Sequence, residues 1–366
     1  MKVTVNDVCS ALEELAPLAL QENYDNAGLL LGNRSTELSG LLLCIDITEA
    51  VLKEAMDKNC NMIVSHHPLI FKGLKSITGR NMVERCVISA IQNNIAIYAC
   101  HTNVDCVSGG VSARMADKIG LINTRILQPK SDSLLKLITF VPTDYLDKVR
   151  NSLFEVGGGH IGDYDCCSYS SKGEGTFRAN ENCKPFVGNL GEINLESEVR
   201  LEIILPSFLK SRITKALLSV HPYEEPAFDF IALANDWNKV GYGIIGELNN
   251  VISDTEFLSN IKDIFKVERI RHTAFSNRQI KKVALCGGSG ADLLNKAIIQ
   301  GADVYISADF KYHDYFLTEN RILLADIGHF ESEQYTKEIF FDQITKKIPK
   351  FALRFSEINT NPINYL

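Results

Sequence analysis

The sequence lacks any long apolar segment. No hydrophobic run approaches the roughly 18 residues that a membrane-spanning helix needs. Asp7, Glu13 and Glu14 interrupt the apolar residues near the start, which argues against a secretory signal peptide. The spacing of these apolar residues instead predicts a helix with Thr4 or Asn6 as its N-cap. We therefore expect a soluble protein.

Paired cysteine motifs are also absent. The ten cysteines are scattered and no C-x-x-C occurs, so we expect reduced thiols in a cytoplasmic protein. Cys44, Cys86 and Cys286 lie in apolar runs and are predicted to be core residues. The adjacent Cys166 and Cys167 point to opposite faces if they lie on a strand, and they are either reactive or ordinary thiols.

Positive charge is scarce. The chain has 38 Lys and Arg against 45 Asp and Glu, a net charge of −7. Broad binding to nucleic acid or to an anionic membrane needs a basic surface, so we expect neither partner. The 366 residues, of which 45% are hydrophobic, suffice for two or more domains with real cores.

The sequence does contain a repeated unit. Residues 40–106 read as strand, helix, strand, helix, strand, and residues 281–333 repeat this order with a shorter middle. Ser65 of the first copy corresponds in spacing to Ser307 of the second. Alternating strands and helices are typical of a parallel sheet covered by helices. We predict an α/β core built from two pseudo-symmetric halves.

A stretch of different character separates the two copies. Its pattern predicts the order βαββαβ, that of a ferredoxin-like α+β domain. The predicted strands cover residues 134–141, 164–170, 199–205 and 228–233, and the predicted helices cover 145–156 and 209–220. We therefore expect a discontinuous core, residues 1–131 and 235–366, with a domain of residues 132–234 inserted into one of its loops.

Both copies end in residues that bind metals. His66 and His67 follow an apolar strand, and Asp105 comes four residues after His101. The second copy ends in an equivalent pair. Chemistry on parallel sheets gathers at the carboxyl ends of the strands, and imidazole is the commonest ligand of divalent metals. We predict a metal site whose ligands are His66, His67, Asp105, His329 and Glu333.

Five side chains are too few to saturate two ions unless a carboxylate or water bridges them. Such a shortage leaves open positions, as catalytic sites require. Mixed nitrogen and oxygen donors favour Zn, Fe, Mn, Co or Ni over Mg or Ca. His101 is either a ligand or a residue that orients Asp105 or a bound water. The alternative to metal binding is that a histidine following a strand has only a structural role.

Five motifs together resemble one family, the dinuclear-metal family called Ngg-interacting-factor-three-like, or GTP cyclohydrolase I type 2. They cover residues 22–29, 65–69, 101–105, 286–290 and 328–333. The resemblance extends over nearly the whole chain and implies the same five ligands, with two divalent ions, most often zinc. One departure is Tyr24, where tryptophan is common.

The inserted region resembles that of the longer bacterial members of this family. The matching motifs are residues 173–178 and 221–226, and the insert as a whole is similar to small nitrogen-regulatory and copper-tolerance proteins. The resemblance implies a toroidal homohexamer with its metal sites facing an internal cavity. The residues His221-Pro222-Tyr223-Glu224-Glu225 either form a structural turn and subunit contact or bind a ligand or metal.

Two further candidates lie within the second copy. The run from Gly287 to Gly290 could cradle a phosphate with its backbone amides, or could simply be a tight turn. Lys311 and His313 follow the strand equivalent to the one ending at His66, and are expected to border the same cleft.

Two functions fit these residues. The first is a metal-dependent hydrolase acting on a small molecule, with GTP as the substrate that the resemblance suggests. The second is a non-enzymatic metal-binding or regulatory scaffold, because the insert resembles signalling proteins. A pair of metal ions does not by itself specify a substrate.

Overall fold

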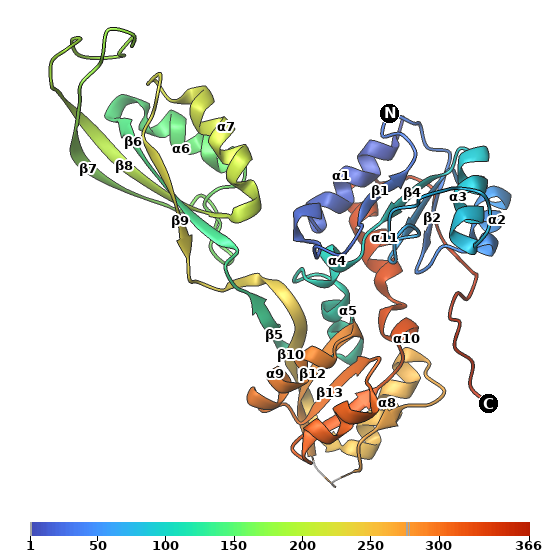
Figure 1. Cartoon of the computed structure of the whole chain (residues 1–366). Coiled ribbons are helices and arrows are strands. Elements are labelled where there is room, and N and C mark those ends of the chain that lie inside the picture. The colour runs from blue at the N-terminus through green and yellow to red at the C-terminus, as the bar shows by residue number, and fades with distance from the viewer. Residues whose placement is uncertain (1, 276, 278) are drawn as a thin grey trace. The chain divides into compact units, whose positions relative to one another are not determined.

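The computed structural model describes residues 2–275, 277 and 279–366, and the chain divides into two compact units. Unit 1 comprises Met1–Gln128 and Val240–Leu366, and unit 2 comprises Pro129–Lys239. Both units combine helices with strands, so the α/β class predicted from the sequence is confirmed (Figure 1).

The first sheet of unit 1 has the strand order β1-β4-β3-β2-β15. Its strands are β1 (Gly28–Leu31), β2 (Leu41–Cys44), β3 (Met62–Ser65), β4 (Ala96–Ala99) and β15 (Leu353–Phe355). Strands β15, β2, β3 and β4 run parallel, whereas β1 pairs antiparallel with β4. Every residue of β2, β3 and β4 is buried, as expected for parallel strands covered on both faces.

Helices cover both faces of this sheet. Helices α2 (Glu49–Asp57) and α3 (Met82–Gln92) pack on one face, and α1 (Val5–Leu15) and α11 (Thr336–Lys347) pack on the other. Thr4 is the N-cap of α1, one of the two caps predicted, and its backbone N–H donates to Asp7 Oδ2 at 2.8 Å. Because α11 comes from the end of the chain, this core joins the first and last parts of the sequence.

The second sheet of unit 1 has the order β11-β14-β13-β12-β10-β5. Its strands are β5 (Ile122–Lys130), β10 (Trp237–Ser253), β11 (Arg271–His272), β12 (Gln279–Ser289), β13 (Val304–Ala308) and β14 (Leu323–Asp326). Strands β12, β13 and β14 are parallel. Helices α5 (Val111–Ile119) and α8 (Asp254–Phe265) cover one face, and α9 (Leu294–Ile299) covers the other.

Short helical turns complete unit 1. Two of them, α4 (Thr102–Asp105) and α10 (His329–Glu333), follow the parallel strands β4 and β14 directly. The remaining turns are the 3-10 helices η1 (Leu18–Leu20), η4 (Ala291–Leu293) and η5 (Tyr312–Thr318). In both sheets, therefore, the chain leaves a buried parallel strand and turns at once into a short helix that carries polar side chains.

Unit 2 is one four-stranded antiparallel sheet with the order β7-β8-β6-β9. Its elements are β6 (Leu134–Pro142), η2 (Thr143–Tyr145), α6 (Leu146–Glu155), β7 (Ser168–Phe177), β8 (Asn194–Pro206), η3 (Ser207–Leu209), α7 (Lys210–Val220) and β9 (Phe228–Leu233). Both α-helices pack on the sheet through a core that includes Val149, Leu153, Ile213 and Leu217.

One predicted strand of unit 2 is misplaced. The strand predicted over residues 164–170 begins only at Ser168 and continues to Phe177. Cys166 and Cys167 precede this strand, and Cys166 has a left-handed conformation with φ of 53°, so the two cysteines do not lie on a strand. A turn closed by hydrogen bonds between the backbones of Ile161 and Tyr164 occupies the residues just before them.

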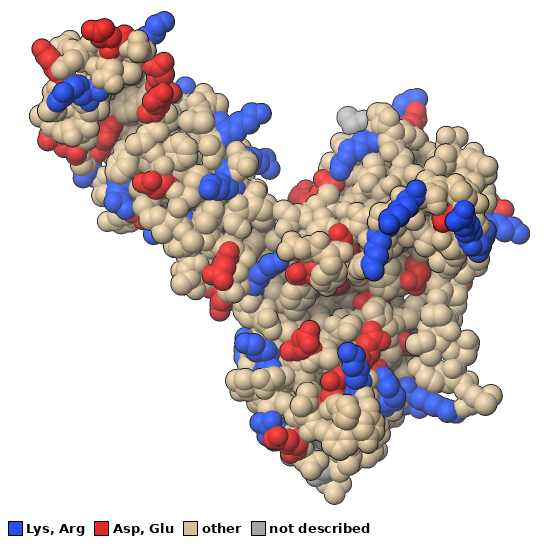
Figure 2. All heavy atoms as spheres, in the orientation of Figure 1, with Lys and Arg blue, Asp and Glu red and all other residues tan. Residues whose placement is uncertain are grey.

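Among the described residues, no helix combines the length and the apolar character that crossing a membrane would require. The predicted core cysteines Cys44, Cys86 and Cys286 are all buried. On the face that Figure 2 displays, acidic and basic side chains are interspersed, and that face shows no broad patch of positive charge.

Candidate metal centre

The end of β3 presents two adjacent histidines. Beyond Ser65 the backbone stays beside β2, because His66 N–H donates to Cys44 O at 3.3 Å and His67 N–H donates to Ile45 O at 3.0 Å. The side chain of His66 is fully buried, and that of His67 is 24% exposed.

Two short helices bring the other candidate ligands. Asp105 is the last residue of α4, and His329 and Glu333 are the first and last residues of α10. Residues four apart in a helix lie on the same face, so His329 and Glu333 project together. The two helices follow corresponding strands of the two sheets, β4 and β14.

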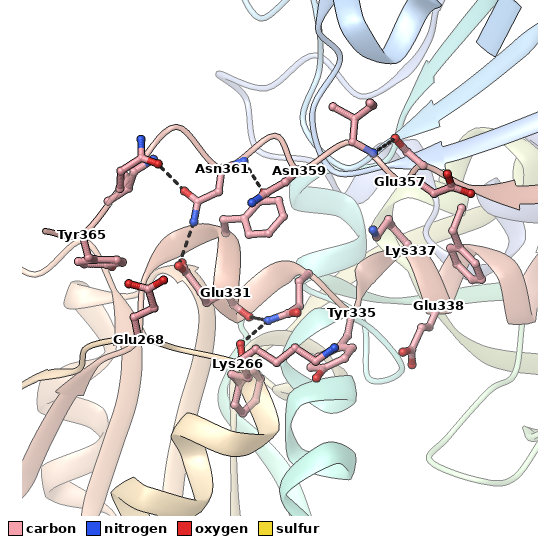
Figure 3. A pocket seen from close by; sticks show the side chains of 18 residues that line it. Lys266, Glu268, Glu331, Tyr335, Lys337, Glu338, Glu357, Asn359, Asn361 and Tyr365 are labelled. Atoms are coloured by element: carbon pink, nitrogen blue, oxygen red, sulfur yellow. Dashed lines mark hydrogen bonds between the residues drawn. The ribbon is translucent and has the colours of Figure 1, made fainter. Parts of the chain in front are cut away.

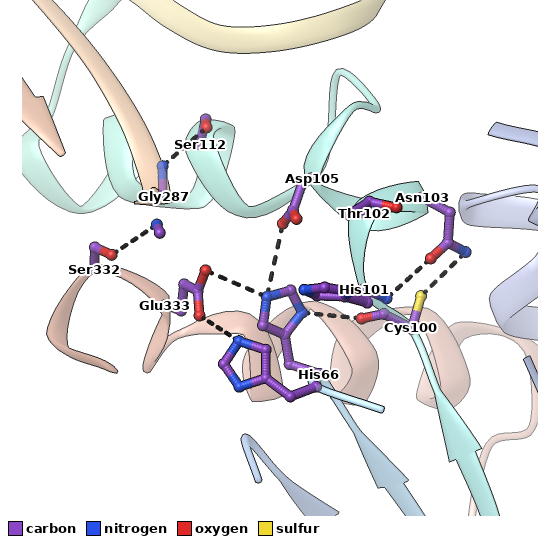
Figure 4. Close-up of polar contacts among 12 residues, drawn as sticks. His66, Cys100, His101, Thr102, Asn103, Asp105, Ser112, Gly287, Ser332 and Glu333 are labelled. Carbon is purple, nitrogen blue, oxygen red and sulfur yellow. Dashed lines mark hydrogen bonds and ion pairs between the residues drawn. The ribbon is translucent and has the colours of Figure 1, made fainter. Parts of the chain in front are cut away.

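Glu333 lies at the centre of the cluster. Its Oε2 is 3.0 Å from His67 Nε2 and 3.2 Å from His329 Nε2. Its Oε1 is 3.5 Å from His66 Nε2, and that nitrogen is 3.7 Å from Asp105 Oδ1. Figure 4 shows Asp105 and Glu333 approaching His66 from separate helices. The structure thus brings the five predicted ligands together.

Four histidines at this site share one feature: Nδ1 lies at hydrogen-bonding distance from a carbonyl or carboxylate oxygen. The pairs are His66 with Cys100 O at 2.9 Å, His67 with Asp46 Oδ1 at 2.7 Å, His101 with Asp25 Oδ1 at 2.8 Å and His329 with Asp309 Oδ2 at 2.7 Å. A proton on Nδ1 that donates to such an acceptor leaves the Nε2 lone pair free. Histidines that bind metals are commonly oriented in this way.

Three buried atoms at this site have only contacts within the cluster and no hydrogen-bond partner outside it among the described residues. They are His66 Nε2, Asp105 Oδ1 and Glu333 Oε2. Buried polar atoms are nearly always paired, so each such atom calls for an explanation. All three are electron-pair donors directed at the same space, and a divalent cation would satisfy them together. The residues present therefore fit metal ions.

The electrostatics of the cluster favour bound positive charge. Although burial opposes it, the hydrogen bonds to Asp46 and Glu333 raise the pKa of His67 to about 10. The pKa of His329 rises to about 9, again against burial, through Glu333 and Asp309. Despite complete burial, the histidines hold the pKa of Glu333 well below its usual range.

Asp105 differs from Glu333. Burial, opposed by His66 and reinforced by the charge on Glu333, raises the pKa of Asp105 to about 7. When two carboxylates share a buried site, their repulsion disfavours ionisation of both unless a cation lies between them. A metal ion would supply that cation.

Candidate donor atoms fall into two groups among the described residues. One group is His66, His67 and His101, and the other is His67, His329 and Glu333, with the atoms of each group within 4.8 Å of one another. His101, whose part was left open by the sequence, therefore lies beside the two adjacent histidines. Its ring centroid is 5.3 Å from each of theirs.

Three carboxylates that orient these histidines were not assigned this part from the sequence. They are Asp25, Asp46 and Asp309. Asp46 follows β2 at the same sheet edge as His66, so the rule that chemistry gathers at the carboxyl ends of parallel strands could have found it. By contrast, Lys311 and His313 are exposed and belong to neither group of donors.

Most of the glycine-rich run, residues 287–289, belongs to strand β12 rather than to an open phosphate loop. Gly287 N–H donates to Ser112 Oγ at 3.3 Å, and Gly288 N–H donates to Ser332 Oγ at 2.9 Å. These amides are thus already engaged, which favours the packing alternative. A Cβ at Gly288 would lie less than 3.0 Å from Glu333 Oε1, closer than real Cβ atoms approach. Glycine is needed here so that Glu333 can reach the cluster.

The C-terminal segment, residues 356–366, contacts two residues that lie next to the candidate ligands. Thr360 Oγ1 donates to Asp46 Oδ2 at 2.8 Å, and the other oxygen of Asp46 contacts His67. Asn361 Nδ2 donates to Glu331 Oε1 on α10 at 2.9 Å (Figure 3). The segment therefore contacts residues that follow both sheets, beside a cavity of about 610 Å³.

Known proteins resemble the chain along its whole length. The model of the Duf34/NIF3 (NGG1p interacting factor 3) family matches residues 3–362. Proteins named GTP cyclohydrolase 1 type 2 homolog are 36% identical in Staphylococcus epidermidis, over 99% of both chains, and 33% identical in Bacillus subtilis, over 100% of this chain and 99% of that protein.

Solved structures agree with this match. A Bacillus cereus protein related to NIF3 superposes with a TM-score of 0.85 at 33% identity, and the match covers 100% of both chains. A Staphylococcus aureus protein gives a TM-score of 0.79 at 31% identity, over 100% of this chain and 99% of that one. The family resemblance inferred from the motifs is thereby confirmed, and the chain belongs to the Duf34/NIF3 (NGG1p interacting factor 3) family.

Proposed function

We propose that this protein is a metal-dependent hydrolase that holds two divalent cations with His66, His67, Asp105, His329 and Glu333. The observation that carries the proposal is the convergence of three buried donor atoms, which have no hydrogen-bond partner outside the cluster among the described residues, with histidines whose Nδ1 atoms are already engaged. Zinc is the first candidate, with Fe, Mn, Co or Ni next, because the donors are a mixture of imidazole and carboxylate.

Each residue has a part that follows from its contacts. Bound divalent ions would supply Lewis acidity and lower the pKa of water. Glu333 directs Oε1 toward His66 and Oε2 toward His67 and His329, so it is placed to serve both ions. His101, held by Asp25, faces the same space and is the candidate proton acceptor.

The candidate substrate is a purine nucleotide. The relatives named GTP cyclohydrolase 1 type 2 homolog support GTP as the first compound to test. Two exposed rings beside the cluster also favour a planar substrate. Phe71, 42% exposed, lies with its centroid 6.3 Å from that of His101, and Tyr24, 66% exposed, lies 6.4 Å from Phe71. Rings of this kind stack on nucleobases.

The direct test loads the purified protein with Zn, Mn, Fe or Co and follows the conversion of GTP to a fluorescent pterin. We expect turnover that His66→Ala abolishes. His160→Ala, a change at an exposed histidine of unit 2, serves as the control and should retain it. An absence of turnover with every metal would rule out GTP, and phosphoesters would then be tested as substrates.

The alternative function is a metal-binding scaffold without catalysis. It is favoured by unit 2, a compact unit with its own core that supplies none of the donor atoms at the cluster. A broad substrate screen separates the two functions. A rate that disappears in His66→Ala supports the hydrolase, whereas stoichiometric metal binding with no rate on any substrate supports the scaffold.

The architecture that we propose is a duplicated core with an inserted ferredoxin-like domain, residues 132–234. The strand order β7-β8-β6-β9 supports the ferredoxin-like assignment. The parallel triplets β2-β3-β4 and β12-β13-β14, one in each sheet of unit 1, support the duplication. We further propose a cytoplasmic homohexamer. Light scattering of the purified protein tests this assembly, and a monomeric mass would contradict it.

A further inference from the structure

Unit 2 contains a cavity of its own, with a volume of about 270 Å³. It lies where the end of β7 meets the loop of residues 178–187 and the turn of residues 221–227. Four aromatic residues contribute to its lining: Phe140, Phe177, Phe186 and Tyr223. The volume falls just below the roughly 300–1,000 Å³ of sites for drug-sized ligands, so an occupant would be a small molecule.

His221 holds the turn that forms one wall. Its Nε2 lies 3.0 Å from Phe140 O, and Tyr223 N–H donates to its Nδ1 at 3.1 Å. Both ring nitrogens are therefore engaged by the backbone, which rules out His221 as a metal ligand and supports the structural turn. Burial also lowers the pKa of His221, consistent with a neutral ring.

This turn places Tyr223 among other rings. The Tyr223 centroid is 6.1 Å from that of Phe186, which in turn lies 5.5 Å from Tyr145 in an edge-on arrangement. Phe186 nevertheless stays 51% exposed. A large apolar ring that packs against neighbouring rings and is still exposed to solvent offers a contact surface to a ligand.

Two polar groups converge on this cavity. A Cβ on Gly175 would lie less than 3.0 Å from Glu198 Oε2, so the glycine makes room for the Glu198 carboxylate to lie across β7. The hydroxyl of Tyr223 is buried beside the Glu198 carboxylate. Burial, and then a side-chain hydrogen bond to Glu198, raise the pKa of Tyr223. A ligand that donates hydrogen bonds would satisfy both groups.

The lining has an excess of negative charge. Glu198, Glu224 and Glu225 face only two cationic side chains, those of Arg178 and Lys184. Both cationic residues are exposed, whereas Glu198 is partly buried. Glu224 is fixed in the wall, because Lys184 N–H donates to its Oε2 at 3.0 Å. The inner charge that a ligand meets is therefore negative.

We propose that this cavity binds a small organic ammonium compound. Its ammonium group would donate to the Glu198 carboxylate and the Tyr223 hydroxyl, and its apolar part would lie against Phe186. Aromatic rings next to an ammonium group add a cation–π attraction. This site is separate from the proposed hydrolase function, because none of its residues belongs to the metal cluster.

The test uses the full chain and three probes of equal chain length: butylamine, butyrate and butanol. Calorimetry and saturation-transfer NMR measure binding. Butylamine should bind in a saturable manner, and the other two at least tenfold more weakly. Glu198→Gln should weaken butylamine binding by about tenfold or more, since a hydrogen bond to a charged group is lost.

Two control variants show whether a loss of butylamine binding is specific to this cavity. Glu174→Gln, at an exposed position on β7 outside the cavity lining, should leave butylamine binding unchanged. His66→Ala should also leave it unchanged, so that failure of the metal site is distinguishable from failure of this one. Absence of saturable butylamine binding, equal binding of butyrate, or full binding by Glu198→Gln would each overturn the proposal.

Discussion

Asp46 Oδ1 lies 2.7 Å from His67 Nδ1. This contact orients the ring so that Nε2 of His67 faces Glu333 and His329, and it favours a proton on Nδ1. The carboxylate of Asp46 thus belongs functionally to the cluster, although it comes from a different strand end than the histidine that it orients.

Asp46→Asn should weaken metal binding by about 10- to 100-fold, because the charge that orients His67 is lost. Competition with a chromophoric chelator measures the affinity. Asp57→Asn removes the same charge from an exposed position at the end of α2 and should leave the affinity unchanged. Equal affinities for the two variants would show that Asp46 has no part in metal binding.

Thr360→Val should lower metal affinity by a smaller factor, about fivefold. The variant keeps the shape of the side chain but removes the hydrogen bond to Asp46 Oδ2, and such a bond contributes about 1 kcal/mol. Thr360→Ser should restore the affinity, because the hydroxyl returns. If serine failed to rescue, the loss would have to come from packing rather than from the hydrogen bond.

Gly288→Ala should displace Glu333 and reduce metal affinity, because the added methyl group overlaps the position of Glu333 Oε1. Gly301→Ala is its control. Gly301 has a similar positive φ, 71° against 63°, and open space around it, so alanine there adds backbone strain alone. We expect both variants to unfold at lower temperature and only Gly288→Ala to lose metal. Metal loss in both would contradict this explanation.

Glu54 should make the attachment of the C-terminal segment dependent on pH. Burial tends to raise its pKa, but Glu357 N–H, Lys58 and Ser356 donate hydrogen bonds to its carboxylate, and the pKa falls below the ordinary 4.5. A carboxyl group with a lower pKa when folded stabilises the protein above the unfolded value. That stability is lost as the pH falls through the lower folded value.

Thermal unfolding of the wild type and Glu54→Gln between pH 6 and pH 3 checks this. The wild type should unfold at the higher temperature near pH 6, and the difference should shrink on acidification below about 4.5. Asp57→Asn, at an exposed position, should show no such convergence. A constant difference across the range would mean that Glu54 acts by packing and not by its charge.

The candidate ligands were readable from the sequence because their signal is local. His66 follows its strand directly, and the spacing from His329 to Glu333 is one helical turn. The helix that begins after Thr4 was predicted for the same reason, since its cap and its apolar spacing lie within one short segment.

The partners of these ligands depend on distances that no local pattern encodes. Asp25 lies 76 residues before His101, and Thr360 lies 314 residues after Asp46. Only the assembled sheets bring these pairs together. The error at Cys166 has a local cause, because its left-handed backbone interrupts a run that otherwise has the composition of a strand.

The positions of the candidate ligands along the chain also determine when the site can form during protein synthesis. His67 and His329 are 262 residues apart. At about 5–20 residues per second, a ribosome needs roughly 13–50 s to make the intervening chain. The proposed cation site is incomplete during that interval. Metal insertion would then be a late maturation step, and prematurely terminated chains would be unable to assemble the full site.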